Sequence, residues 1–443
     1  MALTVARIAD WPTLDAALRR KISSTAVERA RRLEPRLNAF VALEEDLVPV
    51  QGHLGGLPYA AKDMFRTPSH RPTGGLATPS DVAIEGETDL LARLDGAGAR
   101  RVGFTGLPEL AYEPSGYNHA RGRVRNPWNL DFIAGGSSSG SAAAVASGSA
   151  VVALGSDTAG SLRIPAQCCG ITAWKPTYGV VASTGAMPLA PTLDTIGLLA
   201  RSVRDMQGPA NFLIADDAPA TSGTIAHARV ITDCIAAAEQ PIRHACLQGV
   251  GCIEASGTRL ESCTALADIE AVDAHALVIL QAEAARVHRA RTQDLNIAPM
   301  LRKRLAKGLA IDDATLATSI AMRETLLHDF TARVFGTADA IILPVMAMRV
   351  PRVETDPAAD EFSPATLYAL SRFTRFVNML GFPAIALPAG FDDRGLPIAL
   401  QIVGRARTDL ALLALGEAVQ GRSHWHARVP DAIVDAVTEL TEL

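Results

Sequence analysis

The sequence contains little lysine, few aromatic residues and few cysteines. Lysine occurs five times among 42 basic residues, and aromatic residues make up 5% of the chain. Six cysteines in 443 residues are too few for a disulfide framework, and none have C-x-x-C spacing. We therefore interpret the cysteines as buried thiols in a reducing cytoplasm. A coding bias toward arginine would explain the scarcity of lysine, but a lysine that survives such a bias is a candidate for a position that arginine cannot fill.

Signals for secretion, membrane insertion and nucleic-acid binding are also missing. The start, from Met1 to Asp15, has no basic segment followed by an apolar core, and no apolar run approaches the ~18 residues that span a bilayer. The net charge of -5 argues against a general nucleic-acid binder, and 48% hydrophobic residues exclude a disordered chain. We expect a cytoplasmic globular protein with no membrane or nucleic-acid partner.

The sequence shows none of the common motifs for a cofactor or a metal. There is no G-x-x-x-x-G-K-[ST] phosphate loop and no H-E-x-x-H zinc motif. Gly96-Ala-Gly98 lacks the third glycine of a dinucleotide fingerprint and is better explained as a tight turn. Of ten histidines, only His424 and His426 lie close together in the sequence. We therefore predict neither a metal nor a cofactor.

Apolar periodicity and turn residues predict alternating helices and strands. A helix is expected from Leu14 to Glu34, capped by Thr13 and limited by Pro35. The expected strands are Leu57–Phe65, Arg101–Thr105, Ala150–Leu154, Ala338–Val345, Ala384–Pro388 and Leu396–Val403. Further helices are expected at Leu90–Leu94, Ser141–Ser147 and Asp409–Val419. This alternation is typical of an α/β fold with a large sheet, while Asp205 to Leu343 is more helical, with variable-looking loops such as Asp216–Gly223.

The segment from Ile133 to Gly160 is unusually rich in small residues. Of its 28 residues, 8 are alanine, 7 are serine and 6 are glycine, and Asp157 is its only charged residue. A flexible linker is one interpretation, but a linker should contain neither an alanine-rich helix nor the apolar strand that follows it. We therefore expect backbone segments to approach each other, or a ligand, closely in this segment.

Two serine clusters carry the residue types that acyl transfer requires. They are Gly135-Gly136-Ser137-Ser138-Ser139-Gly140-Ser141 and Gly155-Ser156-Asp157-Thr158-Ala159-Gly160-Ser161. Acyl transfer needs a hydroxyl nucleophile, a base for its proton, and N–H donors that face the developing oxyanion. The backbone around Ser161 offers successive N–H groups for that purpose, although either cluster alone is more simply explained as a polar turn.

Lys62 is the candidate base. It follows the largely apolar stretch Leu57–Ala61, and burial lowers the pKa of an ammonium group toward the range of ~7–8 used by catalytic lysines. Arginine cannot take this role because it stays protonated. The alternative is a structural salt bridge, for instance to Asp63.

Two sets of arginines are candidates for binding an anionic substrate. They are Arg121, Arg123 and Arg125 and, later in the chain, Arg349, Arg372 and Arg375. Arginines that bind a substrate carboxylate are the functional interpretation. The more ordinary explanation is a solvated loop for the first set and surface arginines for the second.

Taken together, these motifs resemble the amidase signature family. The matching stretches are Gly56-Leu-Pro-Tyr-Ala-Ala-Lys62-Asp, Gly135-Gly-Ser-Ser-Ser-Gly-Ser-Ala-Ala-Ala, Gly155-Ser-Asp-Thr-Ala-Gly-Ser161-Leu-Arg-Ile-Pro-Ala, Trp174-Lys-Pro-Thr, Leu193-Asp-Thr-Ile-Gly, Asn378-Met-Leu-Gly-Phe-Pro-Ala and Gly395-Leu-Pro-Ile-Ala-Leu-Gln. The resemblance implies one amidase domain with a three-layer α/β/α fold around a large mixed sheet. Its signature core would span about 54–205, a variable helical region about 206–337, and C-terminal core strands and a helix about 338–419.

The resemblance also implies a Ser–cis-Ser–Lys triad. Lys62 matches the family's lysine, Ser137 the bridging serine after a cis peptide, and Ser161 the nucleophile. The oxyanion hole would be formed by Thr158, Ala159, Gly160 and Ser161. Alanine at position 159 departs from the commonest pattern, which has glycine there, and would narrow the space near the scissile carbonyl.

The implied activity is hydrolysis of a small-molecule amide to a carboxylate plus ammonia or an amine, without a metal or cofactor. A homodimer is one option for the assembly. One competing interpretation is the amide-cleaving subunit of a tRNA-dependent amidotransferase, which has the same triad but works with partner subunits. Another is an α/β-hydrolase, because Gly136-Ser-Ser138-Ser-Gly140 matches G-x-S-x-G and His424 or His426 could assist. A scaffold without catalytic activity is the third, although a buried unpaired lysine has no physical use in a binding module.

Overall fold

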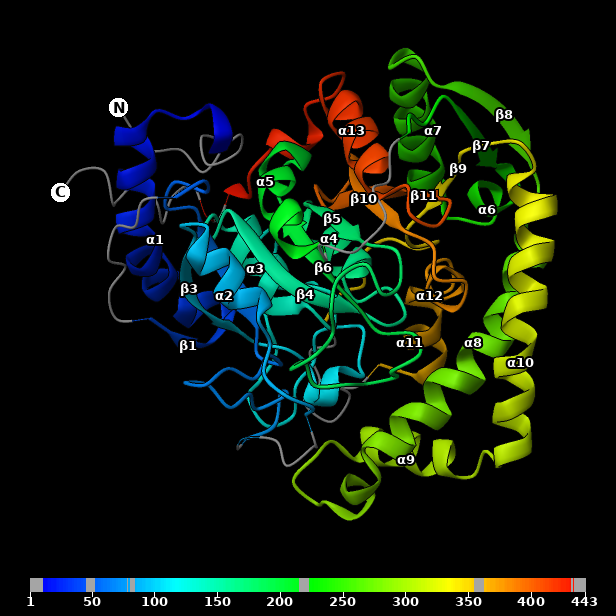
Figure 1. Ribbon diagram of the computed structural model, residues 1–443, viewed down its shortest axis with the longest axis horizontal. Helices are drawn as coiled ribbons and strands as arrows, with labels where there is room; N and C mark the ends of the chain where they lie inside the picture. Colours follow the sequence, from blue (N-terminus) through cyan, green and yellow to red (C-terminus); the bar gives the residue numbers. More distant parts are fainter. Residues whose placement is uncertain are drawn as a thin grey trace.

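The computed structural model describes residues 11–44, 52–77, 79, 84–214, 223–353, 362–431 and 433. In these residues, eleven strands form one mixed sheet in the order β1-β3-β2-β4-β6-β5-β10-β11-β9-β7-β8 (Figure 1). The strands are β1 Phe40–Leu43, β2 Pro58–Lys62, β3 Arg100–Thr105, β4 Val152–Asp157, β5 Thr172–Lys175, β6 Thr195–Ala200, β7 His227–Ile231, β8 Arg259–Cys263, β9 Ala340–Pro344, β10 Ala384–Phe391 and β11 Pro397–Gly404.

Helices cover both faces of this sheet (Figure 1). They are α1 Ala16–Leu37, α2 Leu90–Gly96, α3 Ser139–Ala146, α4 Arg163–Cys169, α5 Val203–Leu213, α6 Thr232–Ala236, α7 Gln240–Ala255, α8 Leu266–Val287, α9 Pro299–Leu309, α10 Asp313–Phe330, α11 Pro364–Leu370, α12 Arg375–Met379 and α13 Asp409–Gln420. The predicted α/β class with three layers and a large mixed sheet is confirmed.

Alternate residues of the central strands enter two different cores, as the period of a β-strand requires. In β2, Tyr59 and Ala61 pack in one core while Ala60 packs in the other, and in β4 Leu154 and Ala153 divide in the same way. Helices α2, α5, α7 and α13 cover the first core, and α1, α3 and α4 cover the second. The strands are buried on both faces, which explains their nearly continuous apolar sequences.

A third core lies among the helices between β8 and β10. Helices α8, α9, α10 and α12 contribute to it, and the long α8 and α10 run side by side at the edge of the molecule (Figure 1). The predicted helical character of this region is correct, but strands β7 and β8 also lie within it and extend the sheet. Neither strand was predicted from the sequence, and β8 is an exposed edge strand, Arg-Leu-Glu-Ser-Cys, without an apolar face. The loop predicted over Asp216–Gly223 lies outside the described residues, apart from Gly223.

The first helix differs from its predicted boundaries at both ends. Asp15, not Thr13, caps α1, because its Oδ1 accepts the N–H of Leu18 at 2.8 Å. The helix continues through Pro35 to Leu37. A proline this close to the end removes only one late hydrogen bond of the helix, so it does not stop the chain from completing the last turn. In the part of the chain that the structure describes, no helix is both long and apolar enough to cross a membrane.

Candidate active site

The candidate site forms where β2 and β4 end next to each other. These strands pair in parallel, with Ala61 opposite Leu154, so their carboxyl ends lie at the same edge of the sheet. Lys62, the last residue of β2, is completely buried there. Its Nζ donates hydrogen bonds to Ser137 Oγ and Ser156 Oγ, both at 2.8 Å. The structure therefore brings the predicted lysine and the predicted bridging serine into direct contact, and it adds Ser156, which the sequence analysis did not single out.

The alternative of a salt bridge between Lys62 and Asp63 is wrong. Asp63 turns to the other side of the chain, where it pairs with His70 Nε2 at 2.7 Å and accepts the N–H of Thr73 at 3.1 Å. Burial lowers the pKa of Lys62 to about 7, and the nearby carboxylates of Asp194 and Asp157 only partly oppose that effect. An amine with this pKa is available as a proton acceptor near neutral pH.

Ser137 stands in a tightly packed turn that leads into α3. The peptide bond between Gly136 and Ser137 is cis. A Cβ atom on Gly136 would lie 2.7 Å from the carbonyl oxygen of Glu113, and one on Gly140 would lie 2.2 Å from that of Ala39. Both positions therefore exclude any side chain. The linker interpretation of this segment is wrong, and the predicted close approach of backbone segments is confirmed at these two glycines.

Ser161 lies just before α4, in the wall of a cavity whose unfilled space, counted out into open solvent, is about 410 Å³. Its carbonyl oxygen accepts the N–H of Ser138 at 3.2 Å, so the two serine clusters pack against each other. Within the described residues, Ser161 Oγ has no hydrogen-bond partner. The structure thus joins Lys62 to Ser137 and places Ser161 on the adjacent turn with its hydroxyl unengaged, and catalytic hydrogen bonds of this kind often tighten only when substrate binds.

The turn from Thr158 to Ser161 is the predicted oxyanion hole. In the part of the chain that the structure describes, the backbone N–H groups of Thr158, Ala159 and Ser161 have no hydrogen-bond partner. The N–H of Gly160 instead donates to Asp157 Oδ1 at 2.8 Å. Since an N–H group carries a single hydrogen, Gly160 is not free to meet an oxyanion, contrary to the prediction for that residue.

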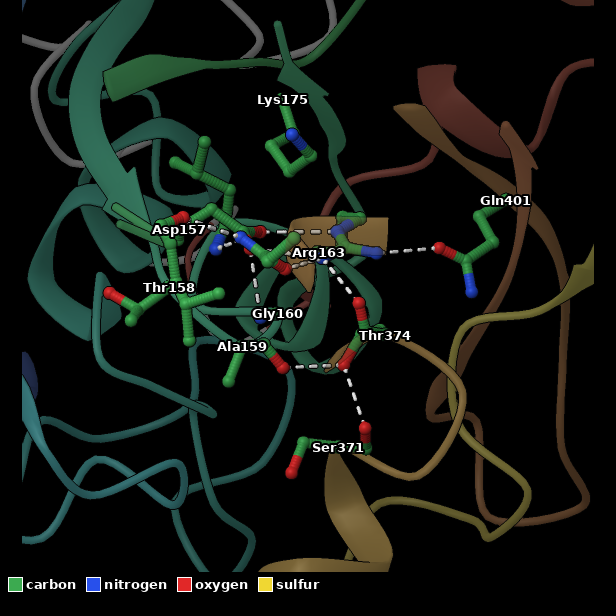
Figure 2. Close-up of polar contacts among 12 residues, drawn as sticks. Asp157, Thr158, Ala159, Gly160, Arg163, Lys175, Ser371, Thr374 and Gln401 are labelled. Atoms are coloured by element: carbon green, nitrogen blue, oxygen red, sulfur yellow. Dashed lines mark hydrogen bonds and ion pairs between the residues drawn. The ribbon is translucent and has the colours of Figure 1, made fainter. Parts of the chain in front are cut away.

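A buried charge network holds this turn in place (Figure 2). Asp157 receives two hydrogen bonds from Arg163, from Nη2 at 2.9 Å and from Nε at 3.1 Å, and both side chains are fully buried. Burial opposes ionisation of Asp157, but the Arg163 guanidinium and backbone N–H donors outweigh it and lower the pKa of the carboxyl to about 2. Arg163 also donates to Gln401 Oε1 at 2.9 Å and to Asn378 Oδ1 at 2.7 Å. In the sequence, Asp157 is the only charged residue between 133 and 160. That isolation was the signal that it holds the turn in place.

Replacing Arg163 by methionine is expected to lower the free energy of unfolding by about 3–5 kcal/mol, because the substitution leaves the carboxylate of Asp157 buried without its partner. Urea unfolding at pH 7 measures the change. The matched control is Arg352→Met, which removes an exposed ion pair to Asp131 at 2.8 Å and should change stability by less than about 1 kcal/mol. Equal stability of the two variants would contradict the role of Arg163 as the buried partner of Asp157.

The arginines considered for anion binding either pair with carboxylates or do not line this cavity. Arg375 lines the cavity, but its guanidinium is bound by both carboxylate oxygens of Asp273 at 2.5 and 2.6 Å. Arg349 pairs with Glu239 and Arg372 with Glu270. None of the triplet at 121, 123 and 125 lines this cavity. Arg304, which the sequence analysis overlooked, does line it and lies 4.0 Å above the ring of Tyr112.

The geometry around Ser138 does not support the α/β-hydrolase interpretation. The hydroxyl of Ser138 is buried, donates to the carbonyl oxygen of Ser156 at 3.2 Å and accepts the N–H of the same residue at 3.3 Å. No histidine is among its hydrogen-bond partners in the described residues. The described residues also contain no group of three or more metal-ligating side chains that could hold an ion.

The three-layer fold and the family comparisons place the protein among α/β enzymes that hydrolyse C–N amide bonds. Residues 6–224 and 253–413 match the family described as Amidase. The chain therefore belongs to the amidase family, whose amidase signature motifs the sequence analysis identified.

Known relatives of the chain include amidases and amidotransferase subunits. It is 32% identical to a glutamyl-tRNA(Gln) amidotransferase subunit from Synechococcus sp. (strain JA-2-3B'a(2-13)), over 93% of this chain and 90% of that protein. The crystal structure of an amidase is similar with a TM-score of 0.80 and 29% identity, covering 92% of this chain and 98% of the other. The structure of the corresponding glutamyl-tRNA(Gln) amidotransferase subunit from Thermotoga maritima is similar with a TM-score of 0.81 and 27% identity, covering 96% of this chain and 96% of the other.

Proposed function

We propose that this protein hydrolyses a small-molecule carboxamide to a carboxylate and ammonia or an amine, through an acyl-enzyme on Ser161. The observation that carries the proposal is the contact of the fully buried Lys62 amine with Ser137 Oγ at 2.8 Å, on the turn that packs against Ser161. A lysine held in this way has the pKa of a general base, and the hydroxyl of Ser137 can relay a proton to it.

The proposed reaction proceeds in two halves. Lys62 accepts the proton of Ser137 as Ser137 accepts that of Ser161, and Ser161 Oγ forms a bond to the amide carbon. The N–H groups of Ala159 and Ser161 stabilise the negative oxygen, each contributing about 2.7–4 kcal/mol in the transition state. The C–N bond then breaks and the relayed proton leaves with the nitrogen. Water attacks the resulting ester by the same proton route, and the carboxylate is released.

The cavity beside Ser161 indicates which kind of acyl group would bind. Its apolar walls include Ile164, Leu189, Leu280 and Leu367. They favour an aliphatic or aryl acyl group, because burial of apolar surface then contributes to binding.

The test of this proposal is to locate the acyl group on the protein. The enzyme is mixed with aliphatic, aryl and ureide amides, quenched in acid after milliseconds to seconds, and measured by intact mass and peptide mapping. At least one amide should add the mass of its acyl group to the peptide that contains Ser161, together with release of ammonia or amine. An acyl group on Ser138 instead, or ammonia release from no amide in the panel, would refute the proposal.

A second candidate is the glutamine-hydrolysing component of an amidotransferase, which the similarity to the Synechococcus protein favours. The two functions differ in their dependence on other chains. An enzyme that acts alone releases ammonia from its amide without any partner. An amidotransferase component is expected to hydrolyse glutamine appreciably only when partner proteins and charged tRNA are added.

A further inference from the structure

The peptide group between Ala159 and Gly160 is held from both sides (Figure 2). On one side, its carbonyl oxygen accepts a hydrogen bond from Thr374 Oγ1 at 2.6 Å. On the other, its N–H donates to Asp157 Oδ1 at 2.8 Å. The carbonyl and the N–H of a trans peptide point in opposite directions, so these two bonds together fix the rotation of the peptide plane.

The two bonds belong to a closed ring of hydrogen bonds, in which both the hydroxyl and the carbonyl group of Thr374 take part. The carbonyl oxygen of Thr374 accepts Arg163 Nη2 at 3.0 Å, and the same nitrogen donates to Asp157 Oδ1 at 2.9 Å (Figure 2). Asp157 therefore connects back to the peptide that the hydroxyl of Thr374 holds. The side chains of Thr374, Asp157 and Arg163 are fully buried. A buried ring of hydrogen bonds resists rotation of any one of the groups that form it.

Packing reinforces the hydrogen bonds. A Cβ atom built on Gly160 would lie 2.3 Å from Thr374 Oγ1 and 2.8 Å from Thr374 Cβ. Gly160 has φ of +119°, in a region that L residues rarely adopt. The side chain of Thr374 thus lies directly against the peptide, and position 160 tolerates no side chain between them.

The orientation of this peptide decides where its neighbours point. The N–H of Ala159 belongs to the preceding peptide and that of Ser161 to the following one, and these are the N–H groups that we assign to the oxyanion. Rotation of the peptide between them would turn both groups away from the reacting carbonyl. A donor stabilises an oxyanion only when it lies within about 2.7–3.1 Å of it, so a small rotation has a large effect.

We infer that Thr374 is a positioning residue that orients the oxyanion turn for catalysis. This inference rests on the proposed function, because it assigns Thr374 a part in the same reaction without contact to the substrate. The same segment also contributes Ser371 and Arg375 to the cavity wall, so Thr374 connects that wall to the turn that carries the nucleophile.

The test compares Thr374→Val with Thr374→Ser, using the amide that acylates Ser161 most rapidly. Valine keeps the shape of the side chain but removes the hydroxyl, so kcat should fall by about 10- to 100-fold while KM changes by less than about threefold. Serine keeps the hydroxyl and should restore kcat to within about threefold of the wild type. If valine disturbs folding, Thr374→Ala removes the hydroxyl without adding an atom, and the same loss of kcat is expected for it.

A buried threonine in β5, away from this turn, provides the control. Thr172 Oγ1 donates to the carbonyl oxygen of Arg201 at 3.1 Å. Thr172 pairs with the last residue of β6, whereas Asp157 pairs with the first residue of that strand, so Thr172 lies away from the oxyanion turn. Thr172→Val should lower the unfolding temperature without changing kcat. A purely structural role for Thr374 would give the same result for Thr374→Val, and that outcome would overturn the inference.

Failure of the inference is distinguishable from failure of the proposed function. Unchanged kcat in both Thr374→Val and Thr374→Ala, with the acyl group still found on Ser161, refutes the role of Thr374 alone. Equal losses in Thr374→Ser and Thr374→Val would also refute it, because the hydroxyl would then not be the group that matters. Failure of the proposed function shows itself earlier, as the absence of an acyl group on Ser161 in the wild type.

Discussion

Replacement of Ser161 by alanine is expected to lower kcat for amide hydrolysis by about 10⁴- to 10⁶-fold, the range seen when a serine nucleophile is removed from an enzyme that depends on it. The reason is that the variant keeps the base, the relay serine and the N–H donors but has no atom that can form the acyl ester. Residual rate would come only from binding and from the oxyanion hole. Substrate affinity should remain, because the cavity loses only one hydroxyl.

Single-turnover assays with enzyme in excess over substrate measure this loss most directly, because they report the chemical step separately from product release. The control is Ser138→Ala, whose hydroxyl bonds to the backbone of β4 rather than facing the cavity. It should lose some stability but stay within about tenfold of wild-type activity. If Ser161→Ala retained nearly normal hydrolysis, the nucleophile would have to be a different group, and the proposed mechanism would be refuted.

Much of the fold was predictable because its strands are buried on both faces. Segments such as Ala384–Pro388 and Leu396–Val403 are short, apolar and bounded by glycine or proline, and the structure places β10 and β11 over them. Lys62 was predictable for a related reason. A lysine that follows an apolar strand in a lysine-poor chain is a candidate for burial, and burial is what lowers its pKa.

Partners that lie far apart in sequence could not be predicted in the same way. Thr374 reaches Ala159 across 215 residues, and Arg375 reaches Asp273 across 102. A single sequence contains no pattern that pairs such residues, because the pairing depends on how whole helices pack. The same limit explains why Arg375 was considered for anion binding, although its guanidinium is already occupied by a carboxylate.

Replacement of Lys62 by arginine is expected to lower kcat/KM by about 10²- to 10⁴-fold, the contribution of a positioned general base. Arginine preserves the positive charge and much of the length, but it cannot be deprotonated near neutral pH and so cannot accept the proton of Ser137. The loss should appear in kcat at every pH from 6 to 9. Full activity of Lys62→Arg would show that no uncharged amine is needed at this position.

The wild-type enzyme should also reveal the base in its pH profile. Burial lowers the pKa of Lys62 to about 7, and the uncharged amine is the active form, so kcat/KM should rise as the pH increases through about 7 and level off above it. A second buried lysine complicates the assignment, because burial also lowers the pKa of Lys175 to about 7. Lys175 Nζ donates to the carbonyl oxygen of Pro176 at 2.8 Å.

Lys175→Met separates the two amines. Methionine keeps the bulk of the side chain and removes its titration, so this variant should retain the rise in kcat/KM near pH 7 if Lys62 is the base. The profile is measured with an amide whose leaving group does not titrate between pH 5.5 and 9. Disappearance of the rise in Lys175→Met would assign the titration to Lys175, and a flat wild-type profile over the same range would contradict an uncharged lysine as the proton acceptor.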